Sequence, residues 1–179
     1  RDIKPSNILV AGDAASPQVK VIDFGIAKEI TSDSEQIALT RTFQIIGTPL
    51  YMSPEHLQPS VQSIDTRSDI FSLGCVLFEL LCGRAPLDTK RVKEIGLLEI
   101  QAQLLSEDPV SKESLHTAGV DQELRWIVMK ALEKPKNRRY SSVAALGEDL
   151  TRYLDHLPVL AGPPSGFYIL KKWIRKHRW

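Results

Sequence analysis

The 179-residue sequence is poor in the features that mark several large classes of protein. It has only two cysteines, too few for a disulfide framework and typical of a reducing cytosol. Its 23 lysines and arginines nearly balance its 22 acidic residues, so the composition gives no sign of nucleic-acid binding. No repeat or low-complexity tract appears, and the four histidines show no metal-ligand spacing. With 42% hydrophobic and 25% charged residues, one ordinary globular domain is expected.

The sequence also lacks an apolar run long enough to span a membrane. Its longest such run, residues 70–82, is too short for that and carries Glu79. The run is apolar nearly all round, which predicts a buried central helix. Thr66 followed by Asp69 three positions later is a helix-start signal, and Gly83 is a helix-end signal. Both cysteines lie in this run and are expected to be buried thiols: Cys75 and Cys82.

What the sequence does contain is a dense polar string at its beginning. Asp2, Lys4 and Asn7 lie within six positions, and Asp23 follows in the string Asp-Phe-Gly. Two carboxylates, an amide and an ammonium group suit phosphoryl transfer, which needs oxygen ligands for Mg²⁺ and positive charge near the phosphate. Pro5 favours a loop here, because it has a fixed φ and no N–H. A polar turn before a strand is the simpler interpretation, but the whole set at this spacing is far more specific.

The segment between these two strings predicts a β-hairpin. Residues 8–10 and 19–22 are short apolar runs, and residues 12–17 between them are rich in turn formers. The hairpin is expected to hold Asn7 near Asp23.

Together with Gly-Thr-Pro-Leu-Tyr-Met-Ser-Pro-Glu at 47–55, these strings resemble the catalytic, metal-binding and peptide-positioning loops of eukaryotic-like bacterial serine/threonine protein kinases. The resemblance covers residues 1–155. It implies a mainly α fold, the C-terminal lobe of the protein-kinase-like α+β fold, with a short β-hairpin near the N-terminus. The chain starts inside the catalytic-loop motif, so the N-terminal lobe with its Gly-rich phosphate loop is expected to be absent.

The resemblance assigns roles to the polar residues. Asp2 is the expected catalytic base that orients the substrate hydroxyl, and Lys4 is expected to contact the γ-phosphate of ATP. Asn7 and Asp23 are the expected ligands of Mg²⁺ or Mn²⁺. Further roles are implied for Thr48 in substrate positioning and for Phe24, whose packing helps to set the active state. Gly25 permits backbone angles that are closed to other residues just after Asp23.

Residues 26–46 are polar, carry scattered serines and threonines, and resemble an activation loop. In the family, an arginine at the position of Arg1 often pairs with a phosphorylated residue of that loop, since a phosphate adds charge and strong acceptors. Thr40 and Thr42 are the phosphorylation candidates. The alternative is that both residues are ordinary solvated hydroxyls without a regulatory role.

The rest of residues 1–155 is expected to be structural. The resemblance pairs a buried Glu55 with the distant Arg139, and it places Asp69 against the catalytic-loop backbone. Hydrophobic periodicity predicts further amphipathic helices. They cover residues 97–105, 124–132 and 143–154.

The tail, residues 156–179, departs from the overall charge balance. It has five lysines and arginines and no acidic residue, and its apolar residues recur at helical spacing, which suits a membrane surface. The apolar positions are Phe167, Leu170, Trp173 and Ile174. The segment resembles a basic stretch that precedes a membrane-spanning helix in bacterial kinases. This implies a cytoplasmic kinase domain anchored in the inner membrane by a segment after Trp179. A solvated basic end or a helix packed on the lobe are the alternatives.

Two functional classes stay open. The first is a serine/threonine kinase that acts on protein substrates with ATP, autophosphorylates in trans as a dimer and is inactive as this 179-residue chain alone. The second is a non-catalytic interaction module or pseudokinase. The complete set of Asp2, Lys4, Asn7 and Asp23 favours the first, because a scaffold needs none of them.

Overall fold

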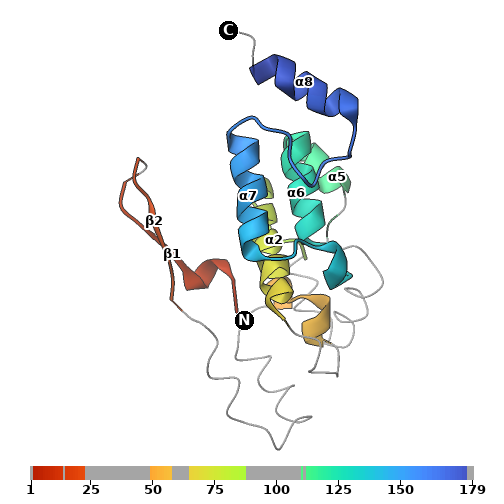
Figure 1. Cartoon of the computed structure of the whole chain (residues 1–179). Helices are drawn as coiled ribbons and strands as arrows, with labels where there is room; N and C mark the ends of the chain where they lie inside the picture. The colour runs from red at the N-terminus through yellow and green to blue at the C-terminus, as the bar shows by residue number, and fades with distance from the viewer. Residues whose placement is uncertain are drawn as a thin grey trace, which may run out of the picture.

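The computed structural model describes residues 2–13, 15–22, 49–57, 65–87, 110 and 112–176. They form a helical bundle with a two-stranded hairpin at its N-terminal side (Figure 1), so the mainly α fold with one hairpin is confirmed. In these ranges, every helix is too short or too polar to cross a bilayer. The longer elements are β1 (Ile8–Ala11), β2 (Gln18–Val21), α2 (Thr66–Cys82), α5 (Lys112–Thr117), α6 (Gln122–Ala131), α7 (Val143–Leu154) and α8 (Gly166–Lys176). Short 3-10 turns are η1 (Pro5–Asn7), η3 (Pro49–Tyr51), η4 (Pro54–Leu57) and η6 (Lys136–Arg138).

Helix α2 is the central helix, as its sequence predicts, but its first turn differs from the prediction. The cap is Asp65, whose side chain accepts a hydrogen bond of 2.8 Å from the N–H of Arg67. Thr66 is therefore the first helical residue, because the Asp65 carboxylate bonds the otherwise unpaired N–H of Arg67. At the other end, Gly83 takes a left-handed φ of 69° and its N–H bonds to the carbonyl of Glu79.

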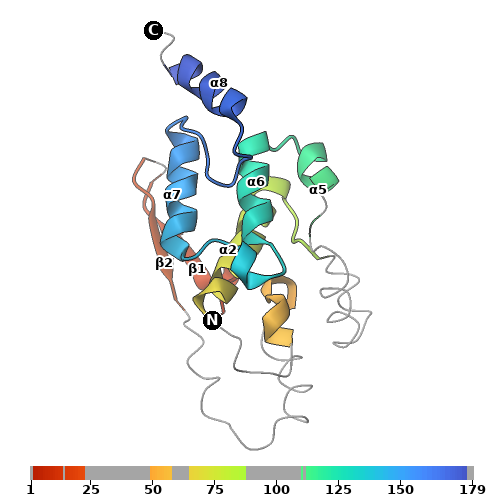
Figure 2. The same cartoon turned by 45° about the vertical axis from the view of Figure 1, so that its right-hand side comes forward.

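The core lies where α2 packs against α6 and α7 (Figure 2). Phe71 and Phe78 of α2 are fully buried there, beside Val128 of α6. The contact is close because Gly74 has no side chain: a Cβ at this position would lie 2.9 Å from the Cβ of Ala131. The glycine therefore sets the distance between the two helices.

The cysteine prediction is confirmed only in part. Cys75 is buried in the core, whereas Cys82, at the last turn of α2, is half-buried. Burial raises the pKa of both thiols, which keeps them protonated and unreactive at neutral pH.

The hairpin projects from the bundle (Figure 1), and its strands pair antiparallel from Ile8 opposite Val21 to Ala11 opposite Gln18. Three apolar side chains of this hairpin are more than half exposed: Leu9, Val10 and Val19. Its turn is closed by Asp13, whose carboxylate accepts hydrogen bonds from two following N–H groups, 3.1 and 2.8 Å long.

The helices expected at 124–132 and 143–154 correspond to α6 and α7, and the expected tail helix corresponds to α8. The helix expected at 97–105 lies outside the described residues. The short α5 was not predicted, because its six residues are too few for a clear helical period.

Candidate active site

The first polar string forms a tight loop that leads into the hairpin. Lys4 is extended, with φ −157° and ψ 159°, and Pro5 then opens the short turn η1. Proline suits this position because its fixed φ fits the first turn and its missing N–H would have had no partner there. The N–H of Asn7 bonds to the carbonyl of Lys4 over 3.0 Å, which closes the loop.

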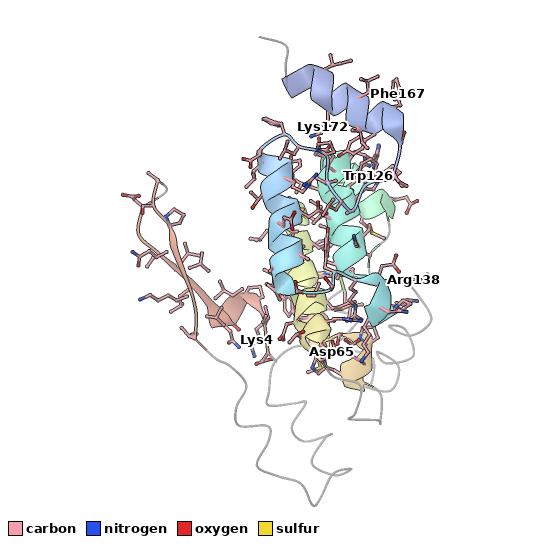
Figure 3. All side chains as sticks on the ribbon, viewed as in Figure 1. Lys4, Asp65, Trp126, Arg138, Phe167 and Lys172 are labelled. Carbon is pink, nitrogen blue, oxygen red and sulfur yellow. The ribbon has the colours of Figure 1, made fainter. Side chains whose placement is uncertain are left out.

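The loop brings three polar side chains together. The Lys4 ammonium lies 2.8 Å from Oδ2 of Asp2, and the two side chains are 17% and 15% exposed. The Asn7 carboxamide donates to the same Asp2 oxygen over 3.3 Å and to the Asp2 carbonyl over 2.9 Å. The site therefore presents one carboxylate and one ammonium group at a partly open surface. Figures 1 and 2 place this end of the chain beside the start of α2, and Figure 3 shows Lys4 there.

Of the two residues expected to bind the divalent cation, Asn7 is described, and its geometry fits that role. Asn7 is 7% exposed, and its Nδ2 is turned to Asp2, so the carboxamide oxygen is the atom left for a metal. The N–H of Ile22, the residue before Asp23, bonds to the Asn7 carbonyl over 3.0 Å. The hairpin thus returns the chain to Asn7 at Ile22, and the position of Asp23 stays a prediction. Within the described ranges, no three carboxylates, thiols or imidazoles form a separate metal site.

Several of the predicted site residues lie outside the described residues, and their roles stay predictions. They are Arg1, Asp23, Phe24, Gly25, Thr40, Thr42 and Thr48. Asp69 is described and lies in the first turn of α2, and its expected bond to the catalytic loop also stays a prediction.

The end of the peptide-positioning loop is fixed by a buried ion pair. Arg139 Nη1 and Nη2 donate to the two carboxylate oxygens of Glu55 over 2.6 and 2.8 Å. Ser68 of α2 adds a third bond to Glu55 over 2.7 Å, and the Arg139 guanidinium lies 4.9 Å from the centre of the Phe71 ring. Glu55 and Arg139 are only 7% and 4% exposed, so the structure contains the pair expected from the sequence.

This environment keeps Glu55 ionised. Burial alone would raise the pKa of its carboxyl group, but the hydrogen bonds from Arg139 and Ser68 outweigh it and hold the pKa at about 2. Arg139 is also held by the carbonyls of Glu133, Lys134 and Arg67, at 2.7, 2.9 and 2.9 Å. The pair therefore ties the loop, the start of α2 and the segment between α6 and η6 to one point.

A polar face of α2 holds the same loop, and sequence reasoning missed it. Besides Ser68, the hydroxyl of Ser72 donates to the carbonyl of Tyr51 over 2.8 Å, and the Tyr51 hydroxyl donates to Glu79 over 2.5 Å. Burial and the bond to Glu79 raise the pKa of Tyr51. The three α2 residues recur at helical spacing (4 and 7 positions) in an otherwise apolar run. That pattern was the available signal for a polar face turned to a partner.

Comparisons with known proteins agree with this geometry. Residues 1–151 match the protein kinase domain family. The serine/threonine-protein kinase PknB of Mycobacterium tuberculosis is 39% identical over 152 residues, which cover 85% of this chain and 22% of that protein. A probable serine/threonine-protein kinase of Streptomyces coelicolor is 36% identical over 168 residues, 93% of this chain and 23% of that protein. The chain thus spans about a fifth of the length of these relatives.

Among solved structures, the Rad53 kinase domain, crystallised with AMPPNP, superposes with a TM-score of 0.56 at 18% identity. The match covers 96% of this chain and 56% of that one. At this identity the likeness concerns the fold alone.

Proposed function

Because this chain belongs to the protein kinase domain family, we propose that the full-length protein is a serine/threonine kinase, which transfers the γ-phosphate of ATP to hydroxyl groups of protein substrates. The observation that carries the proposal is the convergence of Lys4 and Asn7 on the Asp2 carboxylate in one loop, at 2.8 and 3.3 Å. Phosphoryl transfer needs little covalent help from the protein. It depends on placing the hydroxyl and on charge at the transferring phosphate.

Each side chain of the loop has a task in this reaction. The Asp2 carboxylate accepts a hydrogen bond from the substrate hydroxyl, orients its oxygen and takes up its proton. The Lys4 ammonium, next to Asp2, supplies positive charge to the transferring phosphoryl group. Asn7 and Asp23 would hold Mg²⁺ or Mn²⁺, which neutralises phosphate charge when bound.

Serine/threonine specificity is supported by Lys4 two positions after Asp2 and by the names of the relatives. We assign substrate positioning to Thr48, which belongs in sequence to the loop that Glu55 and Tyr51 fasten to α2. We assign regulation to phosphorylation at Thr40 or Thr42, with Arg1 as the partner of the phosphate and a dimer as the arrangement for autophosphorylation in trans.

We also propose that the domain works at the cytoplasmic face of a bacterial inner membrane. The support is the charge of the tail, residues 156–179, which has five lysines and arginines and no acidic residue. The tail is taken as a segment distinct from the lobe of residues 1–155, and residues 152–179 lie beyond the family match.

Phosphate transfer is tested in the full-length protein with the substitution Asp2→Asn. The variant keeps the shape and the acceptor of the Lys4 contact but loses the base, so transfer of labelled γ-phosphate to protein hydroxyls should fall to background. The matched control is Asp13→Asn, at the tip of the hairpin, which should retain activity. Undiminished transfer by Asp2→Asn would overturn the proposed mechanism.

A further inference from the structure

Helix α8 is held against the lobe by one polar face. Tyr168 donates a hydrogen bond of 2.7 Å to Oε1 of Glu123, and the Lys172 ammonium lies 2.5 Å from Oε2 of the same carboxylate. Glu123 belongs to α6 and is 8% exposed, and Lys172 is 9% exposed. The Tyr168 ring also packs edge-on against Trp126, 5.4 Å between centres. One carboxylate of the lobe therefore receives two groups from a single side of α8.

The connector before α8 is fixed as well, which sets the direction of the helix. The buried Asp149 of α7 accepts hydrogen bonds from the N–H groups of Leu160 and Ala161 and from the Tyr140 hydroxyl. The N–H of Val159 donates to the Tyr168 hydroxyl over 2.9 Å. Because both the connector and α8 are bonded to the lobe, the rotation of α8 about its own axis is determined.

That rotation turns an apolar face away from the lobe. Phe167, Leu170 and Ile174 are spaced three and four residues apart and share one face of the helix. Their exposed fractions are 78%, 53% and 46%. Figure 3 shows Lys172 between α8 and the bundle and Phe167 at the outer edge of the helix. The sequence period alone would have allowed this apolar face to be the one that packs on the lobe.

The charge around this face indicates which partner covers it. Residues 156–179 carry five lysines and arginines and no acidic residue, and Glu123 pairs with one of the five, Lys172. A second copy laid face to face would bring two such positive tails together, which electrostatic repulsion opposes. A negatively charged surface with an apolar interior satisfies both the charge and the exposed side chains. With 11 residues, α8 is roughly 16 Å long, too short to cross a bilayer.

We propose that α8 lies in the plane of an anionic lipid bilayer surface, with Phe167, Leu170 and Ile174 inserted among the lipid chains and the lobe on the water side. The inference deepens the membrane location proposed above and rests on it. It adds that the docking helix is bonded to the lobe and that its exposed face is set by Glu123 and Asp149.

The test is co-sedimentation of the 179-residue chain with vesicles of phosphatidylglycerol and phosphatidylcholine in equal parts, and with vesicles of phosphatidylcholine alone. The chain should bind the anionic vesicles, more weakly as salt increases. The double variant Phe167→Ser/Leu170→Ser should bind roughly a hundredfold more weakly, because two apolar side chains no longer enter the lipid. The control is Ile169→Ser, which removes a side chain that is 51% exposed on another face of the same helix.

Three results would overturn the inference: no binding by the unchanged chain, equal binding by the double variant, or an equal loss in the control. A dimer in sedimentation velocity that the double variant dissolves, without vesicle binding, would assign the face to a second copy instead. Thermal melts verify that both variants fold. The vesicle assay contains no nucleotide, so a failure to bind vesicles does not bear on the phosphate-transfer proposal. Inactivity in the kinase assay likewise does not bear on the binding of α8 to lipid.

Discussion

Arg139 binds both carboxylate oxygens of Glu55, a residue 84 positions earlier in the sequence, and thereby fastens the peptide-positioning loop to the segment that follows α6. The two bonds are parallel and buried, the geometry in which an arginine–carboxylate pair contributes most to specificity. The loop that is proposed to place the substrate hydroxyl near Asp2 therefore depends on a residue that is distant from it in the sequence.

Removal of the arginine should destabilise the fold. Arg139→Ala leaves the Glu55 carboxylate buried with Ser68 as a remaining donor, and we expect a loss of about 3–5 kcal/mol in the free energy of unfolding. Chemical denaturation measures it. The matched control is the exposed neighbour Arg138→Ala (Figure 3), which should change stability by less than about 0.5 kcal/mol. Equal stability of the two variants would contradict a structural role for the pair.

The same pair should make stability depend on pH in the acid range. The pKa of Glu55, ordinarily 4.5, is held at about 2 in the folded chain. A depressed pKa means that the stabilisation is fully present above 4.5 and is lost as the pH falls toward 2. Between pH 5 and pH 3 the loss should be about 2 kcal/mol.

Glu55→Gln separates this contribution from the other carboxylates, since glutamine does not titrate. The difference in unfolding free energy between the unchanged chain and this variant should shrink by that amount from pH 5 to pH 3. A difference that stays constant over this range would show that Glu55 titrates normally.

Two helix glycines should respond in opposite directions to the same substitution. Gly74→Ala places a Cβ 2.9 Å from that of Ala131, so α2 and α6 must separate, and we expect a loss of about 1–3 kcal/mol. Gly147→Ala, in α7, meets nothing within 4 Å and should raise stability by about 0.5–1 kcal/mol, because alanine loses less backbone entropy. Thermal melts of both variants decide; a shift of the same sign in both would be evidence against the close approach.

The two residues that hold α8 on the lobe, Lys172 and Glu123, should be energetically coupled. Lys172→Met leaves Glu123 half-satisfied in a buried place, at a cost of about 1–3 kcal/mol. Adding Glu123→Gln removes the uncompensated charge, so the double variant should be more stable than the sum of the two single changes predicts. Thermal melts of the single and double variants measure the stabilities. The rate at which a broad-specificity protease cleaves residues 155–165 measures how firmly α8 is held. Strict additivity would mean that the two groups do not interact.

The 179-residue chain alone should transfer phosphate no faster than its Asp2→Asn variant. Its sequence contains Asp2, Lys4 and Asn7 but no Gly-rich loop to cover the phosphates of ATP, so nucleotide binding should be weak. The assay compares this chain with the full-length protein at equal concentration. Robust transfer by the chain alone would show that these residues suffice for the reaction.

Much of the candidate site could be predicted because its parts are close in sequence. Asp2, Lys4 and Asn7 lie within six positions, so one proline-containing loop is enough to bring them together. The distant partner of Glu55 was also predicted, but from the family resemblance, because no local pattern links it to Arg139. The spacing of the polar residues of α2 was a local signal for a polar face, but its partner was not, because Ser72 and Tyr51 are 21 positions apart.

By itself the sequence determined α2, α6, α7, the hairpin and the polar loop, because periodicity and turn chemistry act between residues a few positions apart. It also determined that the tail is a basic helix with one apolar face. Only the tertiary structure decided which face of that helix meets the lobe. The decision lies with Glu123 and Asp149, buried carboxylates that need donors and find them in Tyr168, Lys172 and the connector. A buried carboxylate needs hydrogen-bond donors, and here residues distant in the sequence supply them. No local sequence pattern identifies such distant partners.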